Sequence, residues 1–350
     1  MRKVFVGLSG GVDSSVAALL LKQQGYDVVG VYMKNWTKDL PGLPCPWLED
    51  FQDAKRVAVQ LGIDFKVYDF EEQYFDKVVK YMLEGFKAGI TPNPDIMCNQ
   101  EIKFKLFLET ALEDGADFIA TGHYARVKNG NLLTAKDAYK DQTYFLHRVR
   151  PAALRKTLFP LGDLTKPEVR QLAKKAGLVT ALKKESMGIC FVGKVGIKDF
   201  LKQYVKEKAG PIIDQKGVAI GRHDGALFYT IGQRQGLDVG GGLPYYVVGK
   251  SMKKNEVYVT TDLQDEKLWS KTVELTDLHW INLQGQSLYQ GLSLQMRTRH
   301  RAKLISVKKL GMPSFSKGIV ELDEEIRALT PGQSAVFYAG STCLGGGIIA

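Results

Sequence analysis

The sequence predicts an α/β protein in which a doubly wound parallel sheet over residues 1–208 is followed by a small β-rich domain over 209–270 and a C-terminal β-barrel over 271–350. Strand and helix patterns alternate through the first 125 residues, which is typical of a parallel sheet covered by helices. After Gly210 and Pro211 the pattern changes to short alternating segments separated by glycines, which indicates β structure. A chain of 350 residues is long enough for two or three such domains.

In the first region, short apolar runs are separated by segments whose apolar residues recur at helical spacing. The pattern predicts strands over 2–8, 27–33, 64–70 and 117–121 and helices over 14–24, 51–61, 75–86 and 104–112. The carboxyl ends of parallel strands share one edge of their sheet, where ligands bind. We therefore expect the loop after the first strand, the end of the second strand at Met33 and the turn formed by Thr121, Gly122 and His123 to lie together.

The remaining elements follow from capping residues and from alternation. Residues 128–177 have a helical and basic pattern, in which Thr165 and Glu168 form a capping box that begins a helix. A last helix is expected over 199–207. Alternating apolar residues then predict strands over 226–231, 245–248, 256–261, 292–307 and 318–322.

Net charge and cysteine content limit the classes of function that the chain can have. A formal net charge of +10 favours a polyanionic partner. The four cysteines lie far apart without a Cys-x-x-Cys pair, which argues against a structural zinc site or a secreted disulfide framework. The sequence has no run of about 18 apolar residues, and its first strand begins too early for a signal peptide. We expect a cytoplasmic protein with no membrane partner and no metal ligands of its own.

A glycine loop joins the first predicted strand to the first predicted helix, where residues 9–14 read Ser-Gly-Gly-Val-Asp-Ser. Gly10 and Gly11 permit positive φ and carry no side chain that would block a ligand. The amides of the first helical turn are free to bind an anion, and Ser9, Ser14 and Ser15 add hydroxyl donors. No lysine follows the glycines, which excludes the Gly-x4-Gly-Lys-Ser/Thr loop of other NTPases. The alternative is an ordinary glycine-rich turn.

Two cysteines lie in segments that suggest chemistry. Pro92 and Pro94 are expected to prevent helix and to display Asp95 and Cys98 on a stiff loop just before a helix, where a thiolate is favoured. Cys190 lies between glycines and beyond two lysines, a setting that also favours a thiolate. For each cysteine the alternative is a buried, inert thiol. The other two, at positions 45 and 343, have no comparable setting and are expected to be structural.

Basic residues cluster in two places. Alternation would place Arg297, Arg299, Arg301 and Lys303 on one face of a strand, where they could follow a phosphate backbone. The alternative is a solvated strand face. A second basic stretch lies over 148–175, between the two candidate cysteines. Two separate basic regions fit an extended polyanion better than a nucleotide alone.

These segments carry a resemblance to known enzymes. The glycine loop is similar to the pyrophosphate loop (PP-loop) of the N-type ATP pyrophosphatases, which have an adenine nucleotide alpha hydrolase-like fold and split ATP into AMP and pyrophosphate. Nearly the whole chain resembles one family of them, the tRNA-specific 2-thiouridylases, which replace oxygen by sulfur on the wobble uridine of tRNA. The matching segments are 7–14, 91–99, 102–104, 120–126, 140–142, 186–193, 229–237, 244–248 and 343–347.

The resemblance implies roles for individual residues. ATP, expected with Mg²⁺ on its pyrophosphate, would be held by Gly7, Leu8, Ser9, Gly10, Gly11, Val12, Asp13, Ser14, Met33 and Gly122. The target base would meet Asn93, Pro94 and Asp95, and the rest of the tRNA would meet Lys140, Asp141, Gln142, Arg299 and His300. The family commonly has tyrosine at the position of His300. Histidine keeps a flat ring there and adds a possible positive charge.

The resemblance also implies a mechanism. ATP would attach AMP to the carbon-2 oxygen of uridine, which makes that oxygen a leaving group. Cys190 would carry a persulfide from a cysteine desulfurase or a sulfur-relay protein, and Cys98 would attack it, leaving a disulfide between the two. Their Cα atoms must then approach to about 4.4–6.8 Å in one state. Asp95 would move a proton, and the substrates would be the tRNAs for Lys, Glu and Gln.

Two other classes of function share parts of this pattern. A ligating or amidating ATP pyrophosphatase, including a tRNA lysidine-type ligase, would use the same loop but has no use for two thiols. Such amidating enzymes often carry a glutaminase domain, and the sequence shows no segment of that kind. An RNA-binding protein with a vestigial nucleotide fold would account for the charge. Pyrophosphate release that requires both ATP and tRNA separates an enzyme from that class.

Overall fold

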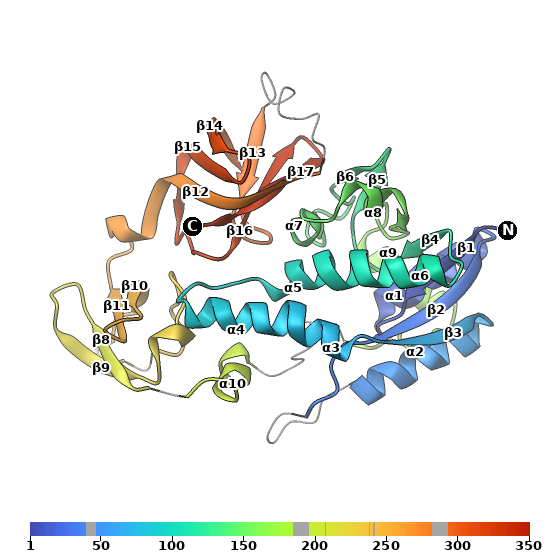
Figure 1. Cartoon of the computed structure of the whole chain (residues 1–350), viewed down its shortest axis with the longest axis horizontal. Coiled ribbons are helices and arrows are strands. Elements are labelled where there is room, and N and C mark those ends of the chain that lie inside the picture. The colour runs from blue at the N-terminus through green and yellow to red at the C-terminus, as the bar shows by residue number, and fades with distance from the viewer. Residues whose placement is uncertain (40–46, 185–195, 207, 238, 241, 282–292) are drawn as a thin grey trace.

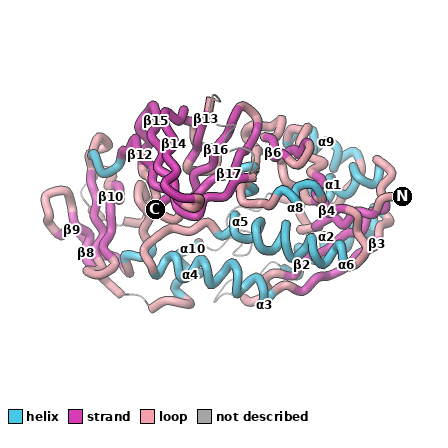
Figure 2. Tube along the Cα trace, turned by 45° about the horizontal axis from the view of Figure 1, so that its top comes forward, coloured by secondary structure: helices cyan, strands magenta, loops and turns pink. Residues whose placement is uncertain are grey.

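The computed structural model describes residues 1–39, 47–184, 196–206, 208–237, 239–240, 242–281 and 293–350. Cys45 and Cys190 lie outside the described residues. The described residues form three sheets, and Figure 1 shows the parallel sheet at the right, a small sheet at the left and a barrel above and between them. The tube view in Figure 2 places the barrel strands in the same intermediate position.

The N-terminal region is a parallel sheet with helices on both faces. Its strands, in the order β3-β2-β1-β4-β7, are β3 (Asp64–Asp69), β2 (Asp27–Lys34), β1 (Lys3–Gly7), β4 (Phe118–Ala120) and β7 (Thr157–Leu158). Val4 and Val6 pack into one apolar cluster and Phe5 into another, because alternate residues of a strand face opposite sides. The doubly wound parallel sheet predicted from the sequence is confirmed.

Each face of this sheet has its own helices. The face of Val4 carries α1 (Val12–Gln23), α2 (Trp47–Leu61) and α9 (Lys166–Lys175). The face of Phe5 carries α3 (Glu71–Tyr74), η1 (Phe75–Val79), α4 (Lys80–Lys87), α5 (Pro94–Met97), η2 (Cys98–Leu106), α6 (Phe107–Glu113) and α8 (Pro151–Arg155). The order of the strands places β1 beside β4, so that loops at their carboxyl ends meet at a topological switch point.

The prediction that prolines prevent a helix around Asp95 and Cys98 is wrong. The helix begins at Pro94 itself. Proline is tolerated at the first helical position because the N–H that it lacks would have no partner within the helix there. Asn93 caps it, because its Oδ1 accepts hydrogen bonds from the amides of Asp95 and Ile96 at 3.2 and 3.3 Å. Asp95 therefore lies in the first helical turn, and Cys98 lies in the turn that follows.

The region predicted to be helical over 128–177 contains short strands as well. The additional elements are β5 (Arg126–Lys128), β6 (Asn131–Leu133), β7 and the short helix α7 (Thr143–Leu146). Strands of two or three residues are too short to show an alternating pattern. The β5–β6 hairpin adds to the barrel sheet, since Leu132 and Leu133 pair with Cys343 and Thr342 of the last strand. The hairpin thus ties the first region directly to the C-terminal barrel.

The small sheet has the order β10-β11-β8-β9. Its strands are β8 (Gly210–Ile213), β9 (Ala219–His223), β10 (Tyr246–Ser251) and β11 (Glu256–Thr260), and α10 (Ile197–Lys202) precedes them. The strand predicted over 226–231 is wrong, because η3 (Ala226–Phe228) is a 3₁₀ turn there. Ala226 and Phe228 are both buried. Burial of every second residue is also the pattern of a strand, which explains the wrong prediction.

Six antiparallel strands close into the predicted barrel. They are β12 (Trp269–Trp280), β15 (Lys317–Arg327), β14 (Ile305–Ser314), β13 (Leu294–Arg297), β16 (Ser334–Ala339) and β17 (Thr342–Ile349), with β17 pairing back to β12. The single strand predicted over 292–307 is wrong, since β13 ends at Arg297 and β14 begins at Ile305. Arg299, Arg301 and Lys303 consequently lie on the connection and share no strand face.

The barrel and the small sheet both contact the segment that leads into α5. The amide of Thr91 donates to the carbonyl of Pro331 at 2.8 Å, and its carbonyl accepts from Nε2 of Gln333 at 2.8 Å. The hydroxyl of Thr91 also lies 3.1 Å from that of Thr230. Three residues before Pro94, the chain is therefore fixed from both later sheets. The domain boundaries at 208 and 270 stay a prediction.

Candidate active site

A cavity of about 300 Å³ lies at the carboxyl edge of the parallel sheet. Of the residues expected to hold ATP, those that line it are Gly7, Leu8, Ser9, Asp13, Ser14, Met33 and Gly122. They come from the end of β1, the start of α1, the end of β2 and the turn after β4, as the shared edge of the strands predicts. Gly10, Gly11 and Val12 belong to the same loop, although they are not among the lining residues.

The two glycines of the loop have different conformations. Gly10 has φ +71°, whereas Gly11 is the N-cap of α1 with φ −96° and ψ 163°. A Cβ at Gly10 would lie 2.3 Å from the carbonyl oxygen of Asp50, but at Gly11 the nearest atom would be Oγ of Ser9 at 3.4 Å. Only Gly10 therefore needs the positive φ and the missing side chain for the fold itself.

Hydroxyl groups of the loop hold its own backbone. Oγ of Ser14 accepts a hydrogen bond from the amide of Ser9 at 3.1 Å and donates to the carbonyl of Gly11 at 3.1 Å. Ser15 is buried, and its hydroxyl donates to the same carbonyl at 2.8 Å. Ser9 and Ser14 line the cavity and Ser15 does not, so the hydroxyl of Ser15 has an internal role.

Gly122 brings the turn after β4 against the start of α1. A Cβ at this position would lie 2.6 Å from the amide nitrogen of Ser14 and 2.8 Å from the carbonyl carbon of Asp13. Those atoms belong to the backbone and cannot move aside as a flexible side chain would. Glycine is therefore required where the two loops meet at the cavity.

Both acidic residues in the described lining of the cavity are paired with lysines that do not line it. The carboxylate of Asp13 binds Nζ of Lys166 through both oxygens at 2.7 Å and accepts from the hydroxyl of Tyr124 at 2.9 Å. Asp50 pairs with Lys183 at 2.8 Å. Among the described residues no cluster of three His, Cys, Asp or Glu side chains could hold a metal ion.

Other lining residues were not expected from the sequence to bind the nucleotide. They are Tyr32, Asn35, Trp36, Trp47, Asp50, Tyr74, Lys103, Thr121, His123 and Gln142. Thr121 and His123 belong to the turn that was predicted to lie at this edge, although no nucleotide contact was assigned to them. Asn35 follows the end of β2, so the same strand edge could have indicated it. Trp47 and Tyr74 reach the cavity through tertiary packing, for which the sequence gives no local signal.

His123 lines the cavity as a neutral side chain. Its ring packs against Phe104 and Phe159 with centroids 5.6 and 6.3 Å away, and its Nδ1 lies 2.8 Å from the hydroxyl of Thr121. Burial, together with the positive charge of Lys103, holds the pKa of His123 well below its usual value. This histidine cannot supply positive charge to a ligand at neutral pH.

The expected catalytic residues Cys98 and Asp95 are not among the described residues that line the cavity. Cys98 is 1% exposed and belongs to the same apolar cluster as Trp36, which lines the cavity. Asp95 is partly buried in the first turn of α5. Cys190 and the motif around it lie outside the described residues, so the approach of the two sulfur atoms stays a prediction.

The residues expected to contact tRNA mostly have partners inside the protein. Asp141 is buried and accepts from the amide of Ala135 at 3.0 Å, and Oε1 of Gln142 accepts from the amide of Tyr124 at 2.9 Å. Arg299 donates to the carbonyl of Ala328 at 2.9 Å and the hydroxyl of Thr330 at 2.8 Å. These contacts fix the loops on which Lys140 and His300 lie.

His300 packs its ring on Phe145 with centroids 4.7 Å apart. Burial lowers its pKa to about 4, with the charges of Arg301, Arg297 and Lys140 acting in the same direction. The positive charge suggested for this position is therefore not expected at neutral pH. A flat, uncharged ring remains, as it would with tyrosine.

We expect the titration of His300 to lower stability at acidic pH. Its folded pKa is about 4 against an ordinary value of 6.5, so the unfolded chain binds the proton first. The contribution of the uncharged His300 ring to the free energy of unfolding is fully present above pH 6.5 and is lost as the pH falls toward 4. Proton NMR should give the low pKa, and chemical denaturation of the His300→Tyr variant should show a weaker pH dependence over this window. An NMR pKa near 6.5 would contradict the burial of the ring.

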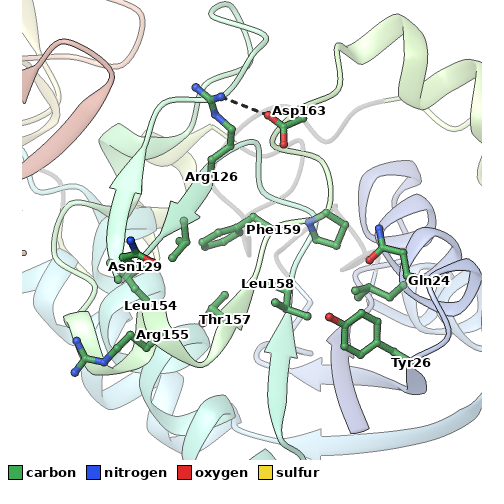
Figure 3. Close-up of a pocket in the computed structure, with 14 residues that line it drawn as sticks. Gln24, Tyr26, Arg126, Asn129, Leu154, Arg155, Thr157, Leu158, Phe159 and Asp163 are labelled. Carbon is green, nitrogen blue, oxygen red and sulfur yellow. Dashed lines mark hydrogen bonds and ion pairs between the residues drawn. The ribbon is translucent and has the colours of Figure 1, made fainter. Parts of the chain in front are cut away.

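A larger hollow of about 610 Å³ lies elsewhere in the molecule, between the end of α1, the β5–β6 hairpin and β7. Figure 3 shows that Arg126 and Asp163 pair across it, at 3.4 Å, above the ring of Phe159. None of the residues expected to bind ATP, the target base or tRNA lines this hollow. The smaller cavity at the strand edge is therefore the candidate site.

Family models match the chain in three consecutive segments. Residues 2–194 match a family described as "tRNA methyl transferase HUP domain". Residues 198–261 match the "tRNA methyl transferase PRC-barrel domain", and residues 270–349 match the "Aminomethyltransferase beta-barrel domain". Within the described ranges, every helix is too short or too polar to span a bilayer.

Curated relatives match the chain over almost its whole length. A protein of Bacillus pumilus (strain SAFR-032) named "tRNA-specific 2-thiouridylase MnmA" is 48% identical over 99% of this chain and 94% of its own. A protein of Bacillus subtilis (strain 168) with the same name is 47% identical over the same shares of the two chains. A solved "4-thiouridine synthetase - RNA complex with bound ATP" is 17% identical, with a TM-score of 0.35 over 58% of this chain and 50% of its own.

Proposed function

The chain belongs to the family of the tRNA-specific 2-thiouridylases, and from that premise we propose that it replaces the carbon-2 oxygen of the wobble uridine of tRNA by sulfur, with ATP as the activating substrate. One observation carries the proposal beyond the family. The glycine loop, Met33 and Gly122 converge on a single cavity at the switch point of the sheet. The amides at the start of α1 give this cavity an anion site.

The triphosphate of ATP lies against the glycine loop in this proposal, and the base extends toward Met33 at the end of β2. The described acidic residues that line the cavity, Asp13 and Asp50, are paired with Lys166 and Lys183. A magnesium ion that arrives with ATP would therefore keep the phosphate oxygens as its ligands. We assign no step of the reaction to a protein-bound metal.

The first step activates the uracil. The carbon-2 oxygen attacks the α-phosphorus of ATP, the bond from that phosphorus to the bridging oxygen breaks, and pyrophosphate leaves with the electron pair. The adenylated oxygen is then a good leaving group. Amides at the start of α1 stabilise the charge that develops on the phosphates. Pyrophosphate and AMP are the two nucleotide products.

The second step transfers sulfur. A persulfide on Cys190 supplies the terminal sulfur atom, which adds to carbon 2 as AMP leaves with its oxygen. Cys98 forms a disulfide with the inner sulfur of Cys190, and an external thiol reductant restores both, which suits the expected cytoplasmic location. Asp95 lies in the first turn of the helix that carries Cys98 and is the proposed proton carrier. Because Cys98 is 1% exposed, the chain around it must move for this step.

We place the tRNA across the parallel sheet and the barrel. Lys140 and His300 would contact it, while Arg299, Asp141 and Gln142 would act by positioning the two loops. The net charge of +10 supports a polyanionic substrate. The tRNAs for Lys, Glu and Gln are the proposed substrates, and a cysteine desulfurase or a sulfur-relay protein is the proposed donor of the persulfide.

Mass spectrometry of the tRNA tests the proposal directly. Unmodified tRNA is incubated with the protein, ATP, Mg²⁺, cysteine and a desulfurase, and the wobble nucleoside is analysed. We expect a nucleoside heavier by one exchange of oxygen for sulfur, formed only when ATP is present. A nucleoside heavier by one methyl group, the chemistry named in two of the family descriptions, would overturn the proposal, as would the absence of any ATP-dependent product.

A further inference from the structure

We propose that Lys103 binds the phosphates of ATP and stabilises the departing pyrophosphate, the role that a loop lysine has in other NTPases. This inference rests on the proposed function, because it concerns the same cavity. Lys103 lies on η2, the helix that also carries Cys98, and it lines the cavity with Ser9 and Ser14. Lys103 is far from the glycine loop in the sequence, so the motif of the loop does not include it.

Charge at the cavity singles out this residue. Among the described lining residues, Lys103 is the one lysine or arginine. The triphosphate of ATP is strongly anionic, and the glycine loop has no lysine to meet it. Backbone amides bind a phosphate oxygen but carry only partial charge. An ammonium group carries a full positive charge and stabilises the negative charge that develops on the leaving group more strongly.

Two other lysines near the cavity bind the acidic residues that line it. Lys166 binds both oxygens of Asp13, and Lys183 bridges Asp50 and Asp53 at 2.8 and 2.6 Å. These lysines cancel the charge of the acidic residues at the cavity and so make it less repulsive to phosphate. They are not lining residues themselves.

The histidine beside Lys103 cannot take its place. His123 also lines the cavity, but it is buried against aromatic rings and uncharged at neutral pH. Lys103 comes to the cavity from η2, whereas His123 comes from the turn after β4 and Ser9 from the glycine loop. Lys103 and the glycine loop therefore approach a bound triphosphate from two directions.

In the adenylation step the bond from the α-phosphorus to the bridging oxygen breaks, and pyrophosphate carries away the electron pair. An ammonium group hydrogen-bonded to that pyrophosphate binds it more strongly as its charge increases. Lys103 therefore acts on both ATP binding and pyrophosphate formation. It does not contact AMP, which lacks the β- and γ-phosphates.

The test compares ATP with AMP in the Lys103→Met variant. Methionine keeps an unbranched apolar side chain but has no charge. Trp36 and Trp47 line the cavity, so the tryptophan fluorescence of the protein reports binding of either nucleotide. We expect the affinity for ATP to fall about 10- to 100-fold, the range of a hydrogen bond to a charged group. The affinity for AMP should stay within about threefold, and Lys103→Arg should recover part of the loss for ATP.

Lys105 provides the matched control. It lies on the same helix, pairs with Glu101 at 2.7 Å and does not line the cavity. Lys105→Met should leave the affinities for ATP and AMP unchanged. A loss of both nucleotides in Lys103→Met, or no loss of either, would overturn the proposal; the first result would indicate a purely structural lysine.

The two proposals can fail separately. If the native protein binds ATP but produces no thiolated tRNA, the proposed function fails while the comparison of ATP with AMP still tests Lys103. If the native protein thiolates tRNA and Lys103→Met keeps full ATP affinity, the lysine assignment fails alone. Thermal unfolding of each variant checks that the fold is retained, and pyrophosphate release measures the effect on the step itself.

Discussion

Replacing Cys98 with serine is expected to abolish thiolation of tRNA while leaving the binding of ATP intact. Serine has nearly the same size, but its hydroxyl does not form a disulfide and is a poor nucleophile toward a persulfide at neutral pH. Removing such a nucleophile lowers turnover by about a thousandfold or more. Cys98 does not line the nucleotide cavity. The fluorescence titration with ATP should therefore match that of the native protein, and liquid chromatography of digested tRNA should show no 2-thiouridine.

Cys343 is the control for this substitution. It is equally buried, at 1% exposed, and its thiol donates to the carbonyl of Thr143 at 3.8 Å. Burial raises its pKa to about 12, so it is an inert thiol at neutral pH. The Cys343→Ser variant should thiolate tRNA at the native rate once that rate is corrected for the fraction of the variant that is folded. Full activity in Cys98→Ser, or equal loss in both variants, would remove Cys98 from the mechanism.

Hydrogen bonds link the barrel region to the segment that precedes the helix of Asp95. Thr91 is hydrogen-bonded to Pro331 and Gln333 of the barrel region, three residues before the helix that carries Asp95 and Cys98 begins. In the proposed complex, a tRNA on the barrel would be connected to this helix through these hydrogen bonds. The proposed reaction requires access to Cys98, which is 1% exposed, and this connection lies close to the start of the helix that leads into it.

Much of the fold could be predicted because its signals are local. Strands such as β1 and β2 are apolar runs bounded by glycine or charge, and α9 begins at a capping box that the structure contains. The predictions of secondary structure are wrong where local signals conflict or where the segments are too short to show a pattern. Pro94 can begin a helix as well as interrupt one, and the β5–β6 hairpin owes its existence to pairing with a strand two hundred residues later.

The candidate site divides in the same way. The glycine loop, Met33 and Gly122 could be predicted, because the topology of a parallel sheet brings them together. The pairing of Asp13 with Lys166 and the burial of Asp141 depend on contacts between segments that are distant in the sequence. No local sequence pattern predicts such contacts. Lys103 lies in one of the matching segments, 102–104, but its place at the cavity depends on the tertiary structure.

A comparison of Gly10→Ala with Gly11→Ala separates the structural role of the loop from its role in binding. Alanine at Gly10 must adopt φ near +71°, and its Cβ would lie 2.3 Å from the carbonyl oxygen of Asp50. Left-handed strain and a displaced backbone should together destabilise the fold by about 2–4 kcal/mol. We expect a lower midpoint in chemical denaturation and no measurable ATP binding, since the loop can no longer keep its shape.

Alanine at Gly11 meets neither obstacle, because φ is −96° and the nearest atom to a Cβ is the Oγ of Ser9 at 3.4 Å. The free energy of unfolding should therefore change by less than about 1 kcal/mol, the scale of an N-cap substitution. The methyl group would nevertheless stand among the amides that face the phosphates, so ATP affinity should fall while AMP affinity falls less. Equal destabilisation by the two substitutions would show that the loop does not have the conformation from which its anion site follows.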